Sequence, residues 1–415
     1  MKLPSSLKAI LLFFLVFLSA YILFSKGITN DHIHLFNAGY RIPFIQECYK
    51  GLELSHQHLL SYRNEVPNYY PVENLGDDMG IYYFVPLIMH LFHSDTYLAY
   101  LYLFCTIVFI SYCLSVIGIS LLFENTYIKL FAYFYMAVFA FASLFILDNY
   151  IFAYFITSLI PLLYWLWKKH SEGDIKTIYL ILALLATGLL AGIANQFRLY
   201  SGMGVILIVI AFIALQKNTS ILRKLIFIGV LLSTLPLCKM YFNHEISQRD
   251  KWIEANGNCL PSSKMSGHIT WHNIYLGLGI VDNKYGILWR DTVAFNKAKQ
   301  YNPNLYNMTP EYISAIKNEY LSIVKNDLLF VLKTFVYKSF YILLFVIIFF
   351  NYGFSLIRKV KFNYRIFLPL LLGILFYILP ALLTFPLPHY LLGALNILVL
   401  SELFLINEVY FKHKS

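Results

Sequence analysis

Long apolar runs alternate with short polar connections along most of this chain. A helix that crosses a bilayer needs roughly 20 mostly apolar residues, and about ten runs approach or exceed that length. No repeat recurs and no linker separates a soluble part, so the pattern predicts one integral membrane domain over residues 1–415, all-α and polytopic, with about ten transmembrane helices. The runs lie near residues 7–25, 97–122, 128–147, 150–167, 177–195, 201–216, 224–241, 328–351, 366–385 and 390–410.

The first run is predicted to be a retained helix rather than a cleaved signal peptide. It continues without a break to Phe24. A cleavage site after Ala20 would also need a small residue where Leu18 stands.

Composition and charge favour the same class of protein. Hydrophobic residues make up 59% of the chain and charged residues only 13%, which is too little charge for an ordinary soluble protein of this size. The formal net charge of +10 does not indicate a nucleic-acid partner, because the basic residues cluster between apolar runs. With ten crossings, all these clusters fall on the cytoplasmic side, as the positive-inside rule requires. We therefore expect an inner-membrane protein with both termini cytoplasmic. The clusters are Lys168, Lys169 and Lys176; Lys217, Arg223 and Lys224; Arg358, Lys359, Lys361 and Arg365; Lys412 and Lys414.

Two long polar segments, about 26–96 and 242–327, then lie on the outer, periplasmic side. The first contains "NLGDDMGIYYFVPLIMHLF", a turn followed by about twelve mostly apolar residues, which predicts a re-entrant or interfacial helix rather than a span. The second ends in a helical pattern with a capping residue at Thr309 and a proline at the first helical position. Its apolar residues predict an amphipathic helix on the membrane surface: Ile313, Ile316, Tyr320, Ile323 and Val324.

The five cysteines bear on how these two segments are joined. Only Cys48 and Cys259 lie in the outer segments, where an oxidising compartment allows a disulfide. We predict a bridge between them, with two unbridged thiols as the alternative.

Three acidic residues of the first outer segment are candidates for catalysis. Asp31 follows the first run by only a few residues, so a short tether holds it near the membrane surface. Asp77 and Asp78 are adjacent, and neighbouring carboxylates can bind a divalent metal, position a sugar hydroxyl or act as a general base. The structural alternatives are a turn or cap at Asp31 and a favourable helix N-terminus at the pair.

Cationic and aromatic residues on the outer side are candidates for binding a lipid phosphate. Arg198 lies in a short outer connection, where the positive-inside rule disfavours it. Its guanidinium fork suits phosphate oxygens, whereas contact with ordinary head groups is the alternative. Lys338 lies in the outer half of its run, and His389 and Tyr390 follow Pro386 and Pro388 before the last span. Glu402, near the middle of that span, is either functional or a helix-to-helix hydrogen-bond partner.

The stretch "SGHITWHNIYLGLGIVDNKYGILWRD", residues 266–291, gathers histidines, aromatics and glycines in the second outer segment. Two histidines four residues apart would form half a metal site on a helix, but the glycines argue against a continuous helix, and a hydrogen-bonded loop without metal is the alternative. Its tryptophans and tyrosine can stack on a sugar or anchor the loop at the interface. We interpret the stretch as the lid or acceptor-side wall of an outward-facing cavity, formed by His268, Trp271, His272, Tyr275, Trp289 and Asp291.

Taken together, these features resemble the GT-C superfamily of membrane glycosyltransferases. The acid after the first span, the first outer segment ending in a short helix, the outer Arg198 and the proline-bounded His389–Tyr390 pair carry the resemblance. The layout is similar to that of bacterial enzymes that take sugar from a polyprenyl-phosphate carrier. The stretch "GHITWHNIYLGLGIVDNKYGILWRD" also resembles an outer-loop block found in a subset of bacterial GT-C-like proteins.

The resemblance implies an inverting transfer from a polyprenyl-phosphate-linked sugar to a glycan or lipid acceptor. Asp31 matches the catalytic base, and Asp77 or Asp78 matches the second acidic position. Arg198 matches the cation near the carrier phosphate, with Lys338 as a helper. Many relatives have Arg-Tyr where this chain has His389-Tyr390, which weakens phosphate binding there because His is mostly neutral at pH 7. The resemblance implies no certain cofactor, although a divalent metal could bind at the acids.

Other classes of membrane protein remain alternatives. An O-antigen or polysaccharide polymerase, or a ligase, has a similar number of spans, but this chain has one outer Arg between spans and no paired Arg-rich loops. A lipid-linked glycan transporter is a further alternative. Transporters often show internal repeats and polar residues at helix breaks within the bilayer, whereas polarity here is concentrated outside it.

Overall fold

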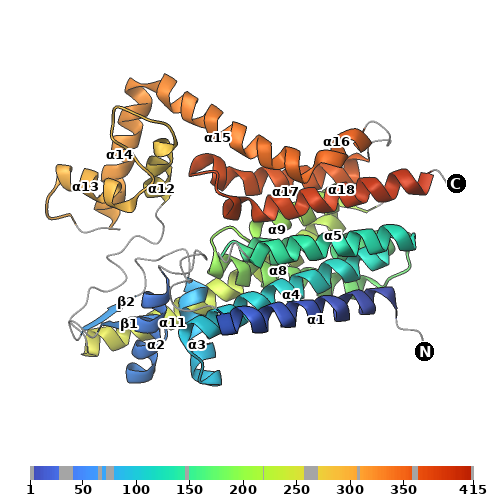
Figure 1. The fold of residues 1–415 in the computed structure, drawn as a ribbon, viewed down its shortest axis with the longest axis horizontal. Coiled ribbons are helices and arrows are strands. Elements are labelled where there is room, and N and C mark those ends of the chain that lie inside the picture. Colours follow the sequence, from blue (N-terminus) through green and yellow to red (C-terminus); the bar gives the residue numbers. More distant parts are fainter. Residues whose placement is uncertain are drawn as a thin grey trace.

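A bundle of long helices carries two smaller units at one end (Figure 1). The computed structural model describes residues 4–27, 41–63, 68–71, 79–144, 149–217, 219–256, 270–305, 309–357 and 363–412. The bundle consists of α1 (Ser5–Gly27), α4 (Thr96–Leu122), α5 (Thr126–Leu144), α6 (Ile151–Thr157), α7 (Ile160–Glu172), α8 (Thr177–Phe197), α9 (Met203–Ala214), α10 (Ile221–Ser233), α11 (Leu235–Asn256), α15 (Leu328–Phe349), α16 (Asn351–Ile357), α17 (Tyr364–Leu383), η5 (Pro388–Leu391) and α18 (Leu392–Lys412).

The two smaller units come from the two outer segments of the sequence. The hairpin unit consists of α2 (Ile42–Ser55), β1 (Leu60–Arg63), β2 (Asn68–Pro71) and α3 (Met79–Phe92). The outer helical unit consists of α12 (Thr270–Leu276), η4 (Gly277–Ile280), α13 (Asp291–Tyr301) and α14 (Pro310–Asn326).

Eight helices of the described chain are long and apolar enough to cross a membrane. The chain is therefore a multi-pass α-helical membrane protein, as the apolar runs predict. All ten runs lie largely in helices. Two of them, α1 and the 12-residue α9, are not among the eight, so ten crossings stay a prediction.

Burial separates central helices from those at the edge of the bundle. In the most apolar stretch of α18 with η5, 83% of residues are buried, and in that of α6 and α7 the share is 72%. The corresponding shares are only 22% for α15 and 11% for α10 with α11. Helices with so many exposed apolar side chains are suited to contact lipid, so α18 and α6–α7 form the centre and α10 and α15 the periphery.

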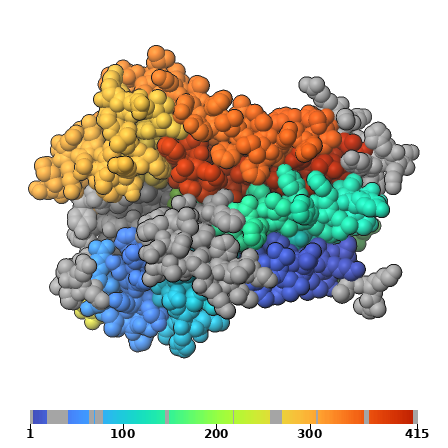
Figure 2. All heavy atoms as spheres, in the orientation of Figure 1, coloured from blue at the N-terminus to red at the C-terminus, as the bar shows by residue number. Residues whose placement is uncertain are grey.

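The two ends of the bundle differ. Helix α1 begins and helix α18 ends at the same end, which we call the terminal end, on the right of Figure 1. The opposite end, called the far end, carries both smaller units, which Figure 2 shows in blue to cyan and in yellow to orange. The described helices and strands of the two outer segments therefore lie at one end of the bundle, as the predicted topology requires.

Glu402 in the central helix α18 satisfies the backbone at a helix break. Helix α15 ends at Phe349 and α16 begins at Asn351. The backbone N–H of Gly353 donates to Glu402 Oε1 over 3.0 Å, and the Tyr135 hydroxyl donates to Oε2 over 3.5 Å. The helix-to-helix interpretation of Glu402 is confirmed.

The hairpin unit contains a predicted helix and an unpredicted pair of strands. Strands β1 and β2 are antiparallel, with Leu60 opposite Pro71 and Arg63 opposite Asn68. The helix expected after "NLGDD" is present as α3. It packs on α2, α4 and α8 and buries Ile81 completely, so it forms part of the protein core, and its re-entrant or interfacial position stays a prediction.

The hairpin unit is joined to the second outer segment by a buried arginine. Helix α11 continues well beyond its apolar run, and its residue Arg249 is completely buried. The guanidinium donates to the Leu59 carbonyl over 3.1 Å and forms an ion pair with Asp250 at 2.8 Å. The two segments are thus linked, but through a side chain and a backbone carbonyl.

The predicted Cys48–Cys259 bridge is not formed at Cys48. This residue is a free thiol, 2% exposed, on the buried side of α2. Burial raises the pKa of the Cys48 thiol, which makes it a poor nucleophile. Cys48 therefore acts as a small apolar core residue, and Cys259 lies outside the described residues.

Helix α14 is the predicted amphipathic helix, but its apolar face covers protein. The Thr309 hydroxyl accepts from the N–H of Tyr312 and caps the helix as expected. Residues Tyr312, Ile316 and Ile323 are buried in a separate core with α12 and α13. The partner for this buried part of the apolar face comes from the same outer segment, and the location of α14 on the membrane surface stays a prediction.

Gly51 is a position at which the fold requires glycine. A Cβ at Gly51 would lie 1.8 Å from the Leu60 carbonyl oxygen, so Gly51→Ala must push α2 away from β1. We expect the free energy of unfolding to fall by about 3 kcal/mol, the upper range for overpacking, as a lower thermal midpoint of the full chain in detergent.

Gly229→Ala in α10 is the matched control, because its Cβ would meet nothing within 4 Å. Alanine is a better helix former than glycine by about 1 kcal/mol, so the control should keep or raise the midpoint. Equal effects of the two substitutions would contradict the close α2–β1 packing.

Candidate functional site

Three segments that are distant in the sequence meet at the far end of the bundle. Arg198 follows α8, Tyr150 precedes α6, and His389 and Tyr390 lie in η5. The Arg198 guanidinium lies 4.6 Å from the centre of the Tyr150 ring, and this ring lies 4.7 Å from that of Tyr390 and 5.6 Å from that of His389. We call these four residues the aromatic–cation cluster. The structure thus brings together three of the four residues predicted to bind a carrier phosphate.

Local backbone features explain how each member is held. The N–H of Arg198 still donates to the Ala194 carbonyl, but its own backbone is extended, so α8 ends there. On the other side, Pro388 begins η5, and the N–H of Tyr390 donates to the Leu387 carbonyl over 3.1 Å. The prolines stop α17 from continuing into α18 and hold the His-Tyr pair in a short turn.

Buried polar groups lie close to the cluster along the chain. Asn149 is completely buried, and neither its amide oxygen nor its amide nitrogen has a hydrogen-bond partner in the described part of the chain. The Ser201 hydroxyl is also unpaired, although the Ser201 carbonyl accepts from the Tyr377 hydroxyl over 2.6 Å. Unpaired buried amides are rare because they cost roughly 1–3 kcal/mol, so Asn149 is suited to pair with polar groups of a ligand.

The start of α3 is fixed against the residue before Arg198. A Cβ on Gly80 would lie 2.9 Å from the Phe197 ring, and Phe84 stacks on the same ring at 5.2 Å. Phe152, two residues after Tyr150, also stacks on the Phe197 ring, at 3.7 Å. Phe197 therefore joins α3, α6 and α8 next to the aromatic–cation cluster.

Lys338 contacts the segment that leads to the cluster. It is 1% exposed, and its ammonium donates to the Leu383 carbonyl over 3.2 Å. Leu383 is the last residue of α17, where a cation is favourable for the helix dipole. Gly277 lies against both groups, since a Cβ there would be 2.9 Å from Lys338 Nζ and 3.0 Å from the Leu383 carbonyl oxygen. In this structure Lys338 therefore caps a helix and packs on η4.

In the outer helical unit, His272 forms a buried hydrogen-bond network. Its ring is 1% exposed. Nε2 lies 3.0 Å from Asp291 Oδ1, and Nδ1 lies 2.5 Å from the Tyr312 hydroxyl. The hydrogen bond from His272 lowers the pKa of Asp291. The network joins the starts of α12, α13 and α14, so it holds this unit together.

The aromatic residues of the same stretch have different surroundings. Tyr275 is 1% exposed and belongs to the core of the unit, so it cannot face a sugar. Trp271 is half-buried, with its ring 5.8 Å from that of Tyr320 and under the Lys317 ammonium at 5.4 Å. Trp289 lies 5.2 Å from Phe385, just before the prolines. Trp289 thus connects the outer helical unit to the segment that carries His389 and Tyr390.

Several predicted residues lie outside the described part of the chain, namely Asp31, Asp77, Asp78 and His268. In the sequence, α3 begins directly after Asp78. Within the described residues, no group of three His, Cys, Asp or Glu side chains is placed to bind a metal.

Sequence reasoning missed Tyr150, Asn149 and Tyr312. The first two form an Asn-Tyr pair between two apolar runs, a polar interruption that marks a helix end. Tyr312 had no such signal, because its partner His272 is 40 residues away in the chain.

Comparisons of the chain with protein-family models, with curated proteins and with solved structures return no match. The GT-C resemblance therefore stays a prediction that rests on the residues themselves.

The His272–Asp291 bond predicts a pH-dependent stability. Because the folded pKa of Asp291 lies below its ordinary value of 3.8, the bond stabilises the fold above pH 3.8 and loses its contribution as the pH falls through the folded pKa. Asp291→Asn should lower the thermal midpoint at neutral pH, and this difference from the native chain should close below pH 3.8. With Asp291 72% exposed, we expect an effect of only about 0.5–1 kcal/mol.

Asp282→Asn is the control, since Asp282 is an exposed carboxylate in the same segment. It should leave the midpoint unchanged at every pH. A difference for Asp291→Asn that stays constant across the acid range would contradict the assigned bond.

Proposed function

We propose that the chain is a membrane glycosyltransferase that moves a sugar from a polyprenyl-phosphate carrier to a glycan or lipid acceptor outside the cytoplasm. The observation that carries the proposal is the aromatic–cation cluster. A half-buried arginine, three aromatic rings and a neighbouring unpaired amide converge at one end of a membrane bundle. Such a site offers charge for a phosphate and aromatic and polar groups for a sugar.

Charge distribution supports an outward-facing site. The basic residues of the described connections gather at the terminal end, which the positive-inside rule assigns to the cytoplasm. The cluster lies at the far end, with both outer units. A donor carried on a lipid must react at the membrane boundary, and the cluster adjoins the ends of α8 and α17, two helices that are long and apolar enough to cross a membrane. The basic residues are Lys168, Lys169, Lys176, Lys217, Arg223, Lys224 and Arg365.

The proposed reaction is an in-line displacement at the anomeric carbon. The Asp31 carboxylate takes the proton of the acceptor hydroxyl as its oxygen bonds to the anomeric carbon. The bond from this carbon to the phosphate oxygen breaks, and the polyprenyl phosphate leaves with the electron pair. Arg198 stabilises the charge that grows on the phosphate. The sugar is therefore transferred with inversion.

Other residues have supporting roles in this proposal. Asp77 or Asp78 positions the sugar or a divalent metal, and His389 and Tyr390 complete the phosphate side. Lys338 acts through the end of α17, whose last carbonyl it holds. Trp271 and Trp289 are half-buried residues of the outer helical unit that form the acceptor-side wall, whereas His272 and Tyr275 support the wall from inside.

Arg198→Gln tests the phosphate role in cells. It removes a cation that acts mainly in the transition state, so transfer should slow by about a hundredfold. Mass spectrometry of surface and lipid-linked glycans should then show one sugar missing and its polyprenyl-phosphate donor accumulating, at equal protein expression. Asp31→Asn should give the same profile.

Lys299→Gln, which replaces an exposed lysine of α13 outside the stretch 266–291, is the matched control and should leave both glycan pools unchanged. Shortened chains of intact repeat units in Arg198→Gln cells would instead indicate a polymerase. An unaltered profile in both Arg198→Gln and Asp31→Asn cells would reject the transferase.

A further inference from the structure

The terminal end of the bundle contains a cavity that the proposed reaction does not use. It encloses about 480 Å³ between the ends of α7 and α9 and the starts of α10 and α17. A neighbouring cavity of about 750 Å³ shares part of its wall. The inner wall of the smaller cavity is apolar, with Trp167, Phe212 and Ile366.

The rim of the smaller cavity is strongly cationic. Four basic side chains line it, and no Asp or Glu of the described chain does so. The larger cavity differs, because Glu124 and Glu408 lie in its wall. The four cations come from three connections of the bundle and surround one opening: Lys168, Lys217, Arg223 and Arg365.

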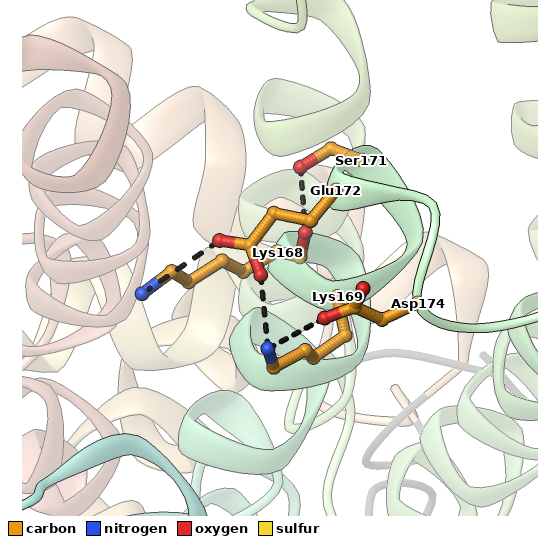
Figure 3. A network of polar contacts seen from close by, with 5 residues as sticks. All are labelled: Lys168, Lys169, Ser171, Glu172 and Asp174. Carbon is orange, nitrogen blue, oxygen red and sulfur yellow. Dashed lines mark hydrogen bonds and ion pairs between the residues drawn. The ribbon is translucent and has the colours of Figure 1, made fainter.

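These charges are poorly neutralised by the protein. Figure 3 shows the ion pairs that Glu172 and Asp174 form at the end of α7. Glu172 and Asp174 bind Lys169 at 3.0 and 2.7 Å, whereas Lys168 lies at the longer distance of 3.9 Å from Glu172. Lys217, Arg223 and Arg365 form no ion pair with any residue that the structure describes. The carboxylates at the end of α7 are therefore directed to Lys169, which does not line the cavity. Glu124 and Glu408 line the neighbouring cavity together with Lys168, Lys217 and Arg365, but form no ion pair with these three cations within the described residues.

Two polar atoms of the cavity wall also lack partners. The amide oxygen of Gln216 and Nδ1 of His170 are buried, and neither has a hydrogen bond within the described chain. An amide oxygen accepts hydrogen bonds, so it is suited to a ligand that carries hydroxyl groups as well as negative charge. A ligand that carried negative charge but no hydrogen-bond donor would leave the Gln216 oxygen unpaired.

We propose that this cavity binds the phosphate headgroup of an anionic phospholipid from the leaflet at the terminal end. The phosphate lies among Lys217, Arg223 and Arg365, headgroup hydroxyls donate to Gln216, and the glycerol backbone and upper acyl chains cover the apolar wall. Basic pockets between membrane helices commonly bind such headgroups. The site does not depend on the transferase proposal, since it lies at the opposite end of the bundle.

Native mass spectrometry of the full-length chain in detergent tests the site. Phosphatidylglycerol and phosphatidylcholine are added in turn, and the native chain should retain only the former. Because each surface cation contributes about 1 kcal/mol to binding of anionic lipid, Lys217→Gln with Arg365→Gln should weaken retention about thirtyfold. Lys217→Arg keeps the charge and should retain the lipid.

The control is Lys129→Gln with Lys176→Gln, which removes the same charge from the same end, outside both cavities. It should bind phosphatidylglycerol as the native chain does. Thermal midpoints of all variants without added lipid verify that they fold equally.

Three results would overturn the proposal. These are equal retention of both lipids, equal loss in the control variant, and undiminished retention by the folded double variant. Inorganic phosphate is added as a competitor to distinguish a lipid headgroup from free phosphate as the bound anion. If it displaces the lipid at equal concentration, the site binds free phosphate, and the lipid assignment is wrong.

Discussion

Backbone polar groups inside a bilayer must find partners within the protein, since lipid offers none. Continuous helices meet this requirement, and side chains meet it where helices are interrupted. Glu402 accepts from the N–H of Gly353 at the α15–α16 break. The hydroxyl of Thr234, between α10 and α11, donates to the Leu185 carbonyl over 2.8 Å. At the α6–α7 break, the Asn396 amide donates to the Thr157 hydroxyl over 2.8 Å, and this hydroxyl in turn donates to the Ala153 carbonyl over 2.7 Å. The central helix α18 thus supplies polar groups to two breaks.

Small residues of α8 allow close helix packing next to the junction between α10 and α11. A Cβ on Gly188 would lie 2.1 Å from the Leu231 oxygen, and one on Gly192 would lie 2.7 Å from the Leu235 oxygen. Helix α8 can therefore approach α10 and α11 through their backbones, as membrane helices often do at small residues. This packing fixes α8, which ends at Phe197 next to Arg198, against α10 and α11.

The requirement that polar groups inside a bilayer find partners also explains why ligand binding and catalysis are expected at the two ends of the bundle. Polar groups are concentrated where the bundle leaves the apolar region, and the ends differ in kind. The far end combines one arginine with aromatic rings and two folded units, which suits recognition of a substrate. The terminal end combines several cations around an apolar cavity, which suits a lipid headgroup. The two proposals therefore concern separate surfaces that can be tested independently.

The sequence by itself determined the class of protein, the helices and the polar segments. Apolar runs long enough to span a bilayer predicted α4 and α8, and local capping signals predicted α14, because these features depend on neighbours within a few residues. The strands β1 and β2, the extension of α11 to Arg249 and the break between α6 and α7 were not predicted. Hydropathy and local propensity cannot predict a helix end whose position depends on a contact with a side chain that is distant in the sequence.

Tertiary structure decided which candidates come together. Arg198 and the His389–Tyr390 pair are far apart in the sequence, and Tyr150 was not predicted at all; only the packing of α6, α8 and η5 makes them one cluster. Likewise, His272 had the spacing of half a metal site, but its partners Asp291 and Tyr312 come from other helices. The outer segments were expected to be joined by a disulfide, yet buried Arg249 joins them. Local sequence determines helices through short-range hydrogen bonds, whereas contacts between helices depend on shape and burial across the whole chain.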